Sequence, residues 1–436
     1  MSVPHPGAGR VPEATVPLRY LIAAVLAFVL AAAGVVALAG ELAGHYYHPR
    51  LAALTHTVTL GWITLTIMGA SYQLVPIVFA RPIWSERLAR WQFALLVAGM
   101  IGLVAHFYIA EFSGMLWAAG VVGAGIVAHL VNMAMSLRGL ARWTFTARLF
   151  AMSLAGLVLT LGFGVVLAAD RVARFLPAAG FFPTLHSHFH LALLGWVMPV
   201  VLGVAARVYP MFLLAREPAG WPGRAQLWGL GLGVPLLTLG LLASPWLARV
   251  GALLVAAAVL GHLAWVAEIA RARRRPALDW GLRFVLTGAA CLLPATALGL
   301  GLAFDVLGGP RLALAYAVVA LGGWISLTIV GMMLKIVPFL VWYRVYAPQV
   351  GRAAVPTLAQ LARPALEGLA WWLLTGGVLG LAAALAAGSA AWIRAAGAVL
   401  TLGALAFAAT LGATLQHLRA RTPAARAGSA VGAAVQ

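Results

Sequence analysis

The sequence is short of cysteine and of charge, and each shortage excludes a class of protein. Its one cysteine, Cys291, lies in an apolar run, so the chain forms neither an internal disulfide nor a thiolate metal cage. It has no Cys-x-x-Cys-His sequence, which excludes a built-in c-type cytochrome. Charged residues make up 9% of the chain and hydrophobic residues 63%. A water-soluble core cannot absorb that much apolar surface, so the composition predicts an all-α polytopic membrane protein.

Long apolar runs are what the chain has in abundance, and they define the expected transmembrane helices. Crossing a bilayer takes about 20 consecutive apolar residues in an α-helix. Twelve runs are of this kind: 19–38, 51–78, 91–109, 116–135, 149–167, 184–213, 226–242, 250–270, 284–304, 312–342, 369–387 and 392–416.

Acidic residues are also scarce, with 10 Asp and Glu against 29 Lys and Arg and a net charge of +19. The arginines gather in alternate loops: 21 lie on the side that holds both termini, and 6 on the other. The positive-inside rule then predicts a bacterial inner-membrane protein with cytoplasmic N- and C-termini. The charge is therefore a topology signal, and its expected partner is anionic lipid rather than nucleic acid.

Three stretches of the sequence repeat one pattern: HTVTLGWITLTIMGASYQLVP (56–76), HLALLGWVMPVVLGVAARVYP (190–210) and VVALGGWISLTIVGMMLKIVP (318–338). Each has Gly-Trp at one offset, a glycine seven residues before the final proline, and a polar residue three before it. The prolines are spaced by 134 and 128 residues. This predicts three pseudo-symmetric four-helix units (19–140, 141–278 and 279–418), rather than the six-plus-six division of a major-facilitator transporter. A cytoplasmic segment (1–18) and a disordered tail (419–436) would flank them.

The small residues and prolines of this repeat are explained by helix packing. Glycine lets helices approach closely, and the proline marks a helix end or a kink near the cytoplasm. The polar residues at the third position before the proline, Arg207 and Lys335 among them, lie close enough to that end to snorkel.

Histidines gather at the predicted outer face, and ionisable groups within a membrane are functional candidates. His186 and His190 are four residues apart and share a helix face, whereas His188 faces nearly the opposite way. His56 and His190 hold equivalent positions in the repeat, so they can approach each other if the three repeat helices surround a common centre. Imidazole ligands from two helices suit haem iron, copper or zinc.

The other histidines have a simpler interpretation. His45, His48 and His106 are expected to be interfacial residues that bond to water or to a neighbouring helix. His129 and His262 lie deeper and are expected to form hydrogen bonds between helices.

In this arrangement the chain resembles subunit I of the haem–copper oxidase and nitric oxide reductase superfamily, closest to its C-type oxidases. The resemblance implies that His56 matches the second-helix ligand of low-spin haem and His190 the sixth-helix ligand of copper. The chain also departs from the family. Tyr316 and Val318 stand where the tenth helix should carry haem-ligating histidines, and the seventh span (226–242) lacks the adjacent His-His pair.

Those departures exclude a family-type binuclear centre, so oxygen or nitric oxide reduction by this chain alone is not expected. The segment His188–Trp196 looks like the family's tenth-helix signature placed on the sixth helix. The first hypothesis is therefore haem b held by His56 with His190 or His188, for electron transfer or small-gas chemistry near the periplasmic face. Quinol or a cytochrome subunit would supply electrons, and further membrane subunits are expected.

Two other hypotheses stay open. One is copper or zinc capture and delivery by an outer cluster of His45, His48, His186 and His190. The other is a structural or assembly subunit that keeps the scaffold and has lost the redox site. Non-haem iron would need a carboxylate beside the His186/His190 face, and the outer acids (Glu41, Glu111, Asp170 and Asp305) are more simply interfacial residues.

Overall fold

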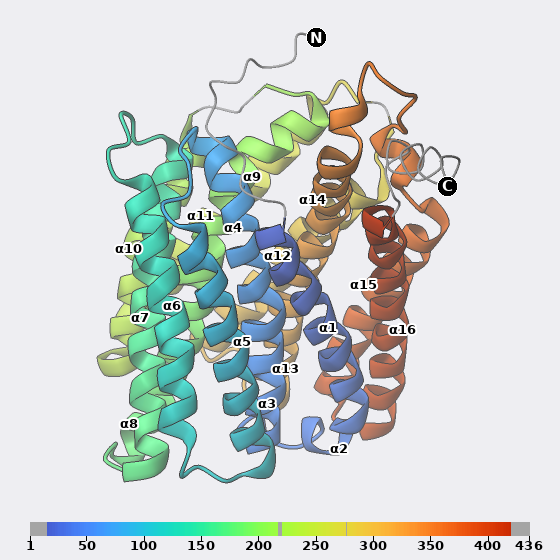
Figure 1. Cartoon of the computed structure of the whole chain (residues 1–436). Coiled ribbons are helices and arrows are strands. Elements are labelled where there is room, and N and C mark those ends of the chain that lie inside the picture. Colours follow the sequence, from blue (N-terminus) through green and yellow to red (C-terminus); the bar gives the residue numbers. More distant parts are fainter. Residues whose placement is uncertain (1–14, 217–219, 276, 420–436) are drawn as a thin grey trace.

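The computed structural model describes residues 15–216, 220–275 and 277–419, and every regular element in these ranges is helical (Figure 1). Twelve helices there are long and apolar enough to cross a membrane. The expected all-α polytopic class is confirmed, with some spans longer than predicted: the fifth runs from Phe145 to Ala173 rather than over 149–167. The division into three four-helix units stays a prediction.

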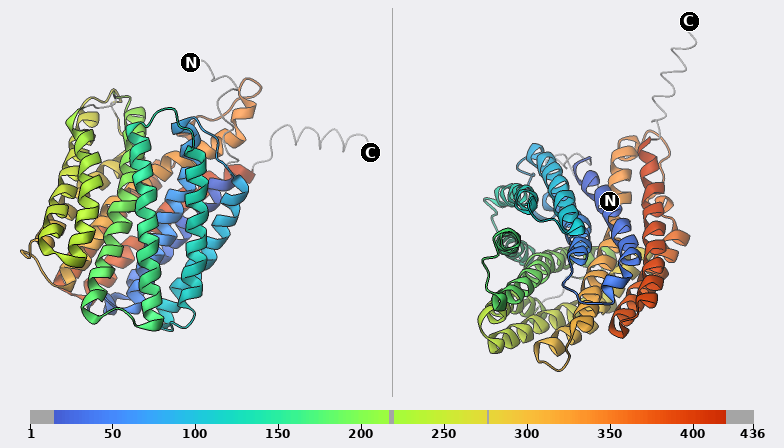
Figure 2. Two further views of the ribbon diagram at one scale, coloured as in Figure 1. Left: turned by 90° about the vertical axis from the view of Figure 1, so that its left-hand side faces the viewer. Right: turned by 90° about the horizontal axis from the view of Figure 1, so that it is seen from below.

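Nine of the spans are single α-helices that follow one another up and down the bundle. They are α1 (Thr15–Ala37), α5 (Glu86–Ile109), α6 (Met115–Leu137), α7 (Phe145–Ala173), α10 (Trp221–Ala243), α11 (Pro245–Arg271), α12 (Trp280–Ala303), α15 (Pro364–Ala387) and α16 (Ala390–Leu415). The first and last of them, α1 and α16, pack against each other, so the first and last spans lie side by side in the bundle (Figure 2).

The second, sixth and tenth spans, which carry the repeat, are longer and are each interrupted by π-helix. We call them the motif helices. They are composed of α3 (Pro49–His56), η1 (Thr57–Thr64) and α4 (Leu65–Phe79); α8 (Ala178–His190), η2 (Leu191–Val197) and α9 (Met198–Leu213); and α13 (Pro310–Val318), η3 (Val319–Ser326) and α14 (Leu327–Val345).

All three π-helical segments begin directly after equivalent positions of the repeat, namely His56, His190 and Val318. A π-helix closes i→i+5 hydrogen bonds, is rare, and occurs mostly as single turns at functional sites. Finding it three times at one offset shows that the repeat is a backbone feature as well as a pattern of side chains. These segments were not predicted from the sequence.

The motif helices form the interior of the bundle. Their most apolar stretches are 72%, 78% and 67% buried, whereas no other span exceeds 50%. The tryptophans of the Gly-Trp pairs, Trp62, Trp196 and Trp324, are at most 2% exposed and fill the centre. Trp62 donates its indole N–H to Ser326 Oγ at 3.0 Å, which joins the second span to the tenth.

Glycines allow two outer helices to reach this interior. A Cβ built on Gly156 of α7 would lie 2.1 Å from the carbonyl oxygen of Gly195 in η2. Gly288 of α12 approaches the tenth span in the same way, since its Cβ would lie 2.9 Å from Trp324 O. Small residues at helix contacts give membrane helices their close packing, because lipid provides no hydrophobic driving force between them.

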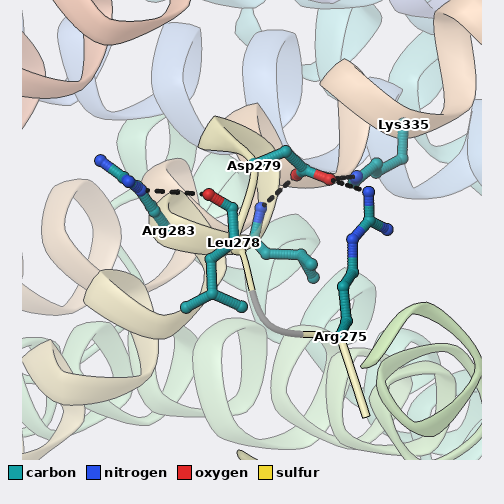
Figure 3. Close-up of polar contacts among 6 residues, drawn as sticks. Arg275, Leu278, Asp279, Arg283 and Lys335 are labelled. Atoms are coloured by element: carbon teal, nitrogen blue, oxygen red, sulfur yellow. Dashed lines mark hydrogen bonds and ion pairs between the residues drawn. The ribbon is translucent and has the colours of Figure 1, made fainter. Parts of the chain in front are cut away.

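We call the end of the bundle at which α1 begins the basic end, and the opposite end, where α3, α8 and α13 begin, the histidine end (Figure 1). At the basic end, Asp279 accepts the Leu282 backbone N–H at 3.1 Å and so caps α12 (Figure 3). Its other oxygen pairs with Arg275 at 3.1 Å and with Lys335 of α14. Lys335 was predicted to snorkel; its side chain is 17% exposed, and at the basic end it ties the tenth span to the start of α12.

Candidate functional site

His56 is the last residue of α3, immediately before the second span widens into π-helix. Its Nδ1 lies 2.8 Å from the carbonyl oxygen of Ala52, one turn earlier. The ring stacks on Phe107 of α5, with centroids 5.1 Å apart and planes 13° from parallel. The imidazole is therefore held by its own helix on one side and by an aromatic ring on its face.

His188 and His190 end α8, and their rings are held in the same manner. His190 Nδ1 lies 2.8 Å from His186 O, and His188 Nδ1 lies 3.1 Å from Thr160 O of α7. Helix α7 passes close to the His188 ring, since a Cβ built on Gly164 would lie 3.1 Å from His188 Cε1. A side chain at that position would displace the ring.

These contacts fix the tautomer of His56, His188 and His190. A backbone carbonyl can only accept a hydrogen bond, so each Nδ1 carries the proton and each neutral ring keeps its lone pair on Nε2. In the described part of the chain no protein group bonds to any of the three Nε2 atoms, and none of them is fully enclosed. An Nδ1–H bonded to a carbonyl with a free Nε2 is the arrangement found in metal-ligating histidines.

Of these rings, His188 is the one that interacts electrostatically with His56. His190 interacts instead with His186, and its ring stacks on Tyr316 of α13 with centroids 6.1 Å apart. His188 and His190 thus face different ways, as their spacing predicts.

In the two loop histidines, His45 and His48, Nδ1 accepts a hydrogen bond instead of donating one. His45 Nδ1 accepts the Tyr47 backbone N–H at 3.0 Å, and His48 Nδ1 accepts that of Arg50 at 3.3 Å and caps α3. Because a backbone N–H can only donate, the proton of each neutral ring is on Nε2, and no lone pair is left for a metal. The described residues hold no group of three or more His, Cys, Asp or Glu side chains placed to bind an ion.

His186 connects the outer loop to the sixth span, since its Nε2 lies 3.1 Å from the Tyr46 hydroxyl. Nearby, Arg171 of α7 pairs with the Tyr47 hydroxyl, and its guanidinium lies 5.6 Å from the centre of the Phe181 ring. Burial raises the pKa of the Tyr47 phenol, and the charge of Arg171 partly offsets this. The sequence analysis did not single out these aromatic residues, although Tyr46 and Tyr47 lie beside His45 and His48.

The outer acids are all engaged in local contacts. Glu41 pairs with Arg50 at 3.1 Å and Asp305 with Arg249 at 2.8 Å. Asp170 accepts the Leu176 N–H at 2.7 Å, and Glu111 accepts the Ser113 N–H at 2.8 Å. These contacts agree with the interfacial interpretation of the acids.

Two other predictions on histidines have different outcomes. His106 lies at the histidine end with its Nδ1 2.8 Å from Glu111 O, as expected of an interfacial residue. His129 was expected to form a hydrogen bond between helices, and this is wrong: it is 0% exposed, and neither ring nitrogen has a partner among the described residues. It packs edge-on against Tyr72 and Trp196 instead.

The π-helical segments meet at a small central cavity of about 30 Å³. All three motif helices line it, with Thr59 from η1, Ala192 and Trp196 from η2, and Leu321 from η3 among the lining residues. This is roughly the volume of one water molecule. The cavity itself is therefore too small for a tetrapyrrole, and a haem on His56 and His188 would have to lie nearer the histidine end.

Comparisons with known proteins give one kind of match. A search of solved structures finds a haem–copper terminal oxidase, determined by cryo-EM as a dimer, with a TM-score of 0.64 and 12% sequence identity. The alignment covers 93% of this chain and 83% of that one. No family model matches the sequence, and no curated protein matches it. At this identity the match shows that the fold is that of a haem–copper oxidase, and it does not show the chemistry.

Proposed function

We propose that this protein binds haem b through His56 and His188 and serves electron transfer or small-gas chemistry as an oxidase-like membrane subunit. One observation carries the proposal: imidazoles from two motif helices lie within electrostatic reach of each other, and each has its proton committed to a carbonyl and its Nε2 free. The oxidase fold is in keeping with it, because the second and sixth spans carry His56, His186, His188 and His190 in their entry segments.

The chain's own residues would prepare this site for the haem, which would supply one-electron redox chemistry. Ala52 O and Thr160 O fix the tautomer and orientation of the two rings, and hydrogen bonds of this kind also raise the basicity of the ligand nitrogen. Phe107 covers the face of His56 and limits access of water. Reduction of oxygen or nitric oxide by this chain alone is not part of the proposal, since Tyr316 and Val318 cannot replace the family's haem histidines.

The orientation in the membrane belongs to the same proposal. A bacterial inner membrane with the basic end in the cytoplasm would place the histidine pair near the periplasmic face. Because the sequence has no c-type attachment site, electrons would come from quinol or from a separate cytochrome subunit.

The test is a reduced-minus-oxidised optical spectrum of protein purified from a haem-replete host, with metal analysis of the same sample. We expect a Soret band that His56→Ala and His188→Ala abolish and His190→Ala preserves. His106→Ala is the matched control, because His106 lies at the same end and also bonds a backbone carbonyl. A wild-type protein without a Soret band would refute haem binding. Loss of the band in His190→Ala but not in His188→Ala would assign the ligand to His190.

Copper binding by His186 and His190 is the second candidate function. These residues lie one turn apart and interact electrostatically, so one ion can reach both rings. Addition of His45 and His48 would require both loop rings to give up their present hydrogen bonds. Copper without porphyrin in the metal analysis would favour this function. A protein with neither would favour a structural or assembly subunit.

A further inference from the structure

A groove at the basic end lies outside the proposed haem site and combines an apolar floor with a cationic rim. It has a volume of about 490 Å³ and lies where α6 ends and α7 begins. Its floor consists of aliphatic side chains, and its rim includes Arg138 and Trp143. The full apolar lining is Ala134, Met135, Leu137, Leu140, Ala151 and Leu154.

Four arginines lie on the chain segments next to the groove, and Arg138 among them lines it; no acid in the described residues pairs with any of the four. Arg81 follows α4, Arg138 ends α6, and Arg142 and Arg148 lie on the loop to α7 and on its first turn. Ion pairs occur elsewhere in the structure, at Arg50, Arg249 and Arg275. The charge at the rim is therefore available to an anion.

One of these arginines also has an unused donor. Arg81 donates from Nη2 to the Arg138 carbonyl at 2.6 Å, which holds its guanidinium at the turn that carries the rim. Its Nε–H is buried and has no partner among the described residues. Because this donor is enclosed, what Arg81 offers to an anion is its charge, held beside the groove: a Cβ built on the lining residue Gly139 would lie 3.7 Å from Arg81 Nη2.

The position of the groove along the membrane-spanning helices indicates which class of ligand it fits. The rim lies at the ends of two membrane-spanning helices, and the floor extends along their sides. Trp143 is 52% exposed at this level, where tryptophan is typically found at membrane–water interfaces. A ligand that satisfies both parts has a phosphate at the arginines and a hydrocarbon chain along the aliphatic floor.

We propose that this groove binds one anionic phospholipid, with its phosphate at Arg138, Arg142 and Arg81 and an acyl chain between α6 and α7. A free phosphate would leave the aliphatic floor uncovered. A zwitterionic lipid would leave the excess positive charge of the rim unneutralised. The site is independent of the proposed haem site, which lies at the opposite end of the bundle.

The experiment is native mass spectrometry of the full chain, released from detergent containing phosphatidylglycerol and phosphatidylcholine with identical acyl chains. Wild type should retain one phosphatidylglycerol in preference to phosphatidylcholine. Arg138→Gln/Arg142→Gln removes two charges that make no side-chain hydrogen bond in the structure, and it should weaken retention by about tenfold to thirtyfold. Ala134→Trp should weaken it equally by filling the floor, because Ala134 is exposed and lines the groove.

Two controls separate this site from a general preference for acidic lipid. Arg344→Gln removes an exposed arginine from the same end on α14, and Ala124→Trp adds the same bulk at an exposed position on α6. Both should retain the lipid as wild type does. Equal retention of the two lipids, or unchanged retention in both groove variants, would overturn the proposal. So would competition by glycerol 3-phosphate at the concentration that phosphatidylglycerol requires, because the site would then be one for free phosphate.

Discussion

The sixth and tenth spans have the same backbone architecture but different side chains at their entry, where only the sixth carries histidines. Both are long, deeply buried helices with a π-helical segment, a Gly-Trp pair in that segment and a proline near the basic end. Yet the sixth begins with His186, His188 and His190, whereas the tenth has Tyr316 and Val318 at the positions of the repeat that correspond to His188 and His190. The widened turn therefore forms without an adjacent histidine, and the backbone architecture is separate from the chemistry placed on it.

The largest expected effect concerns how outer helices reach these two spans. Gly156→Ala places a methyl group against the Gly195 backbone, which cannot move aside, and should destabilise the protein by about 3 kcal/mol or more. Gly288→Ala should cost less, because its Cβ would lie 2.9 Å from the nearest backbone atom, Trp324 O, rather than 2.1 Å, and the closer Thr328 hydroxyl oxygen belongs to a side chain. Thermal denaturation in detergent measures both. Gly162→Ala on α7 is the control, since a Cβ there meets nothing within 4 Å. Equal costs at 156 and 288 would show that the two contacts are equivalent.

An intermediate effect concerns the buried tryptophans. Trp62→Phe removes the hydrogen bond to Ser326 of the tenth span, whereas Trp196 Nε1 has no partner in the described residues. Both substitutions remove the same volume, so Trp62→Phe should be more destabilising by about 1 kcal/mol. The comparison is made by denaturant or thermal unfolding of the two variants side by side. A larger loss in Trp196→Phe would mean that the indole of the sixth span has an acceptor of its own, such as an internal water.

The smallest effect concerns the loops that lead into the motif helices. A backbone hydrogen bond, and then the Arg50 guanidinium, hold the pKa of Glu41 below its usual value. A carboxyl with a lowered folded-state pKa stabilises the protein above its unfolded-state pKa, and this contribution disappears as the pH falls through the folded-state value. Wild type should therefore lose slightly more stability than Glu41→Gln between pH 7 and acid pH, by less than about 1 kcal/mol for so exposed a pair. Identical pH profiles would show that the ion pair contributes nothing.

Much of the fold followed from the sequence, because apolar length and repeated residue types are local properties. The spans and the offset of the three Gly-Trp pairs needed no knowledge of packing. The π-helical segments did not follow, since the sequence analysis found no signal for a widened turn. The preference for His188 over His190 in the proposal also required the structure: it rests on the interaction of His188 with His56 and on the stacking of His190 on Tyr316, which come from other helices. Lys335 was expected to extend to the interface, and its acceptor Asp279 lies 56 residues away.

The three π-helical segments share one further property. A π turn takes in one residue more than an α turn, so the helix before it is rotated about the axis relative to the helix after it, by roughly the 100° that a residue represents. Deleting one residue from any of these segments, for example within 57–64, would rotate the α-helix that precedes it away from its present neighbours. The α-helix that follows it would keep its place in the bundle. The histidine end and the interior of this bundle are thus formed by separate segments of the motif helices. Substitutions can add or remove ligands at the histidine end while the interior keeps its packing.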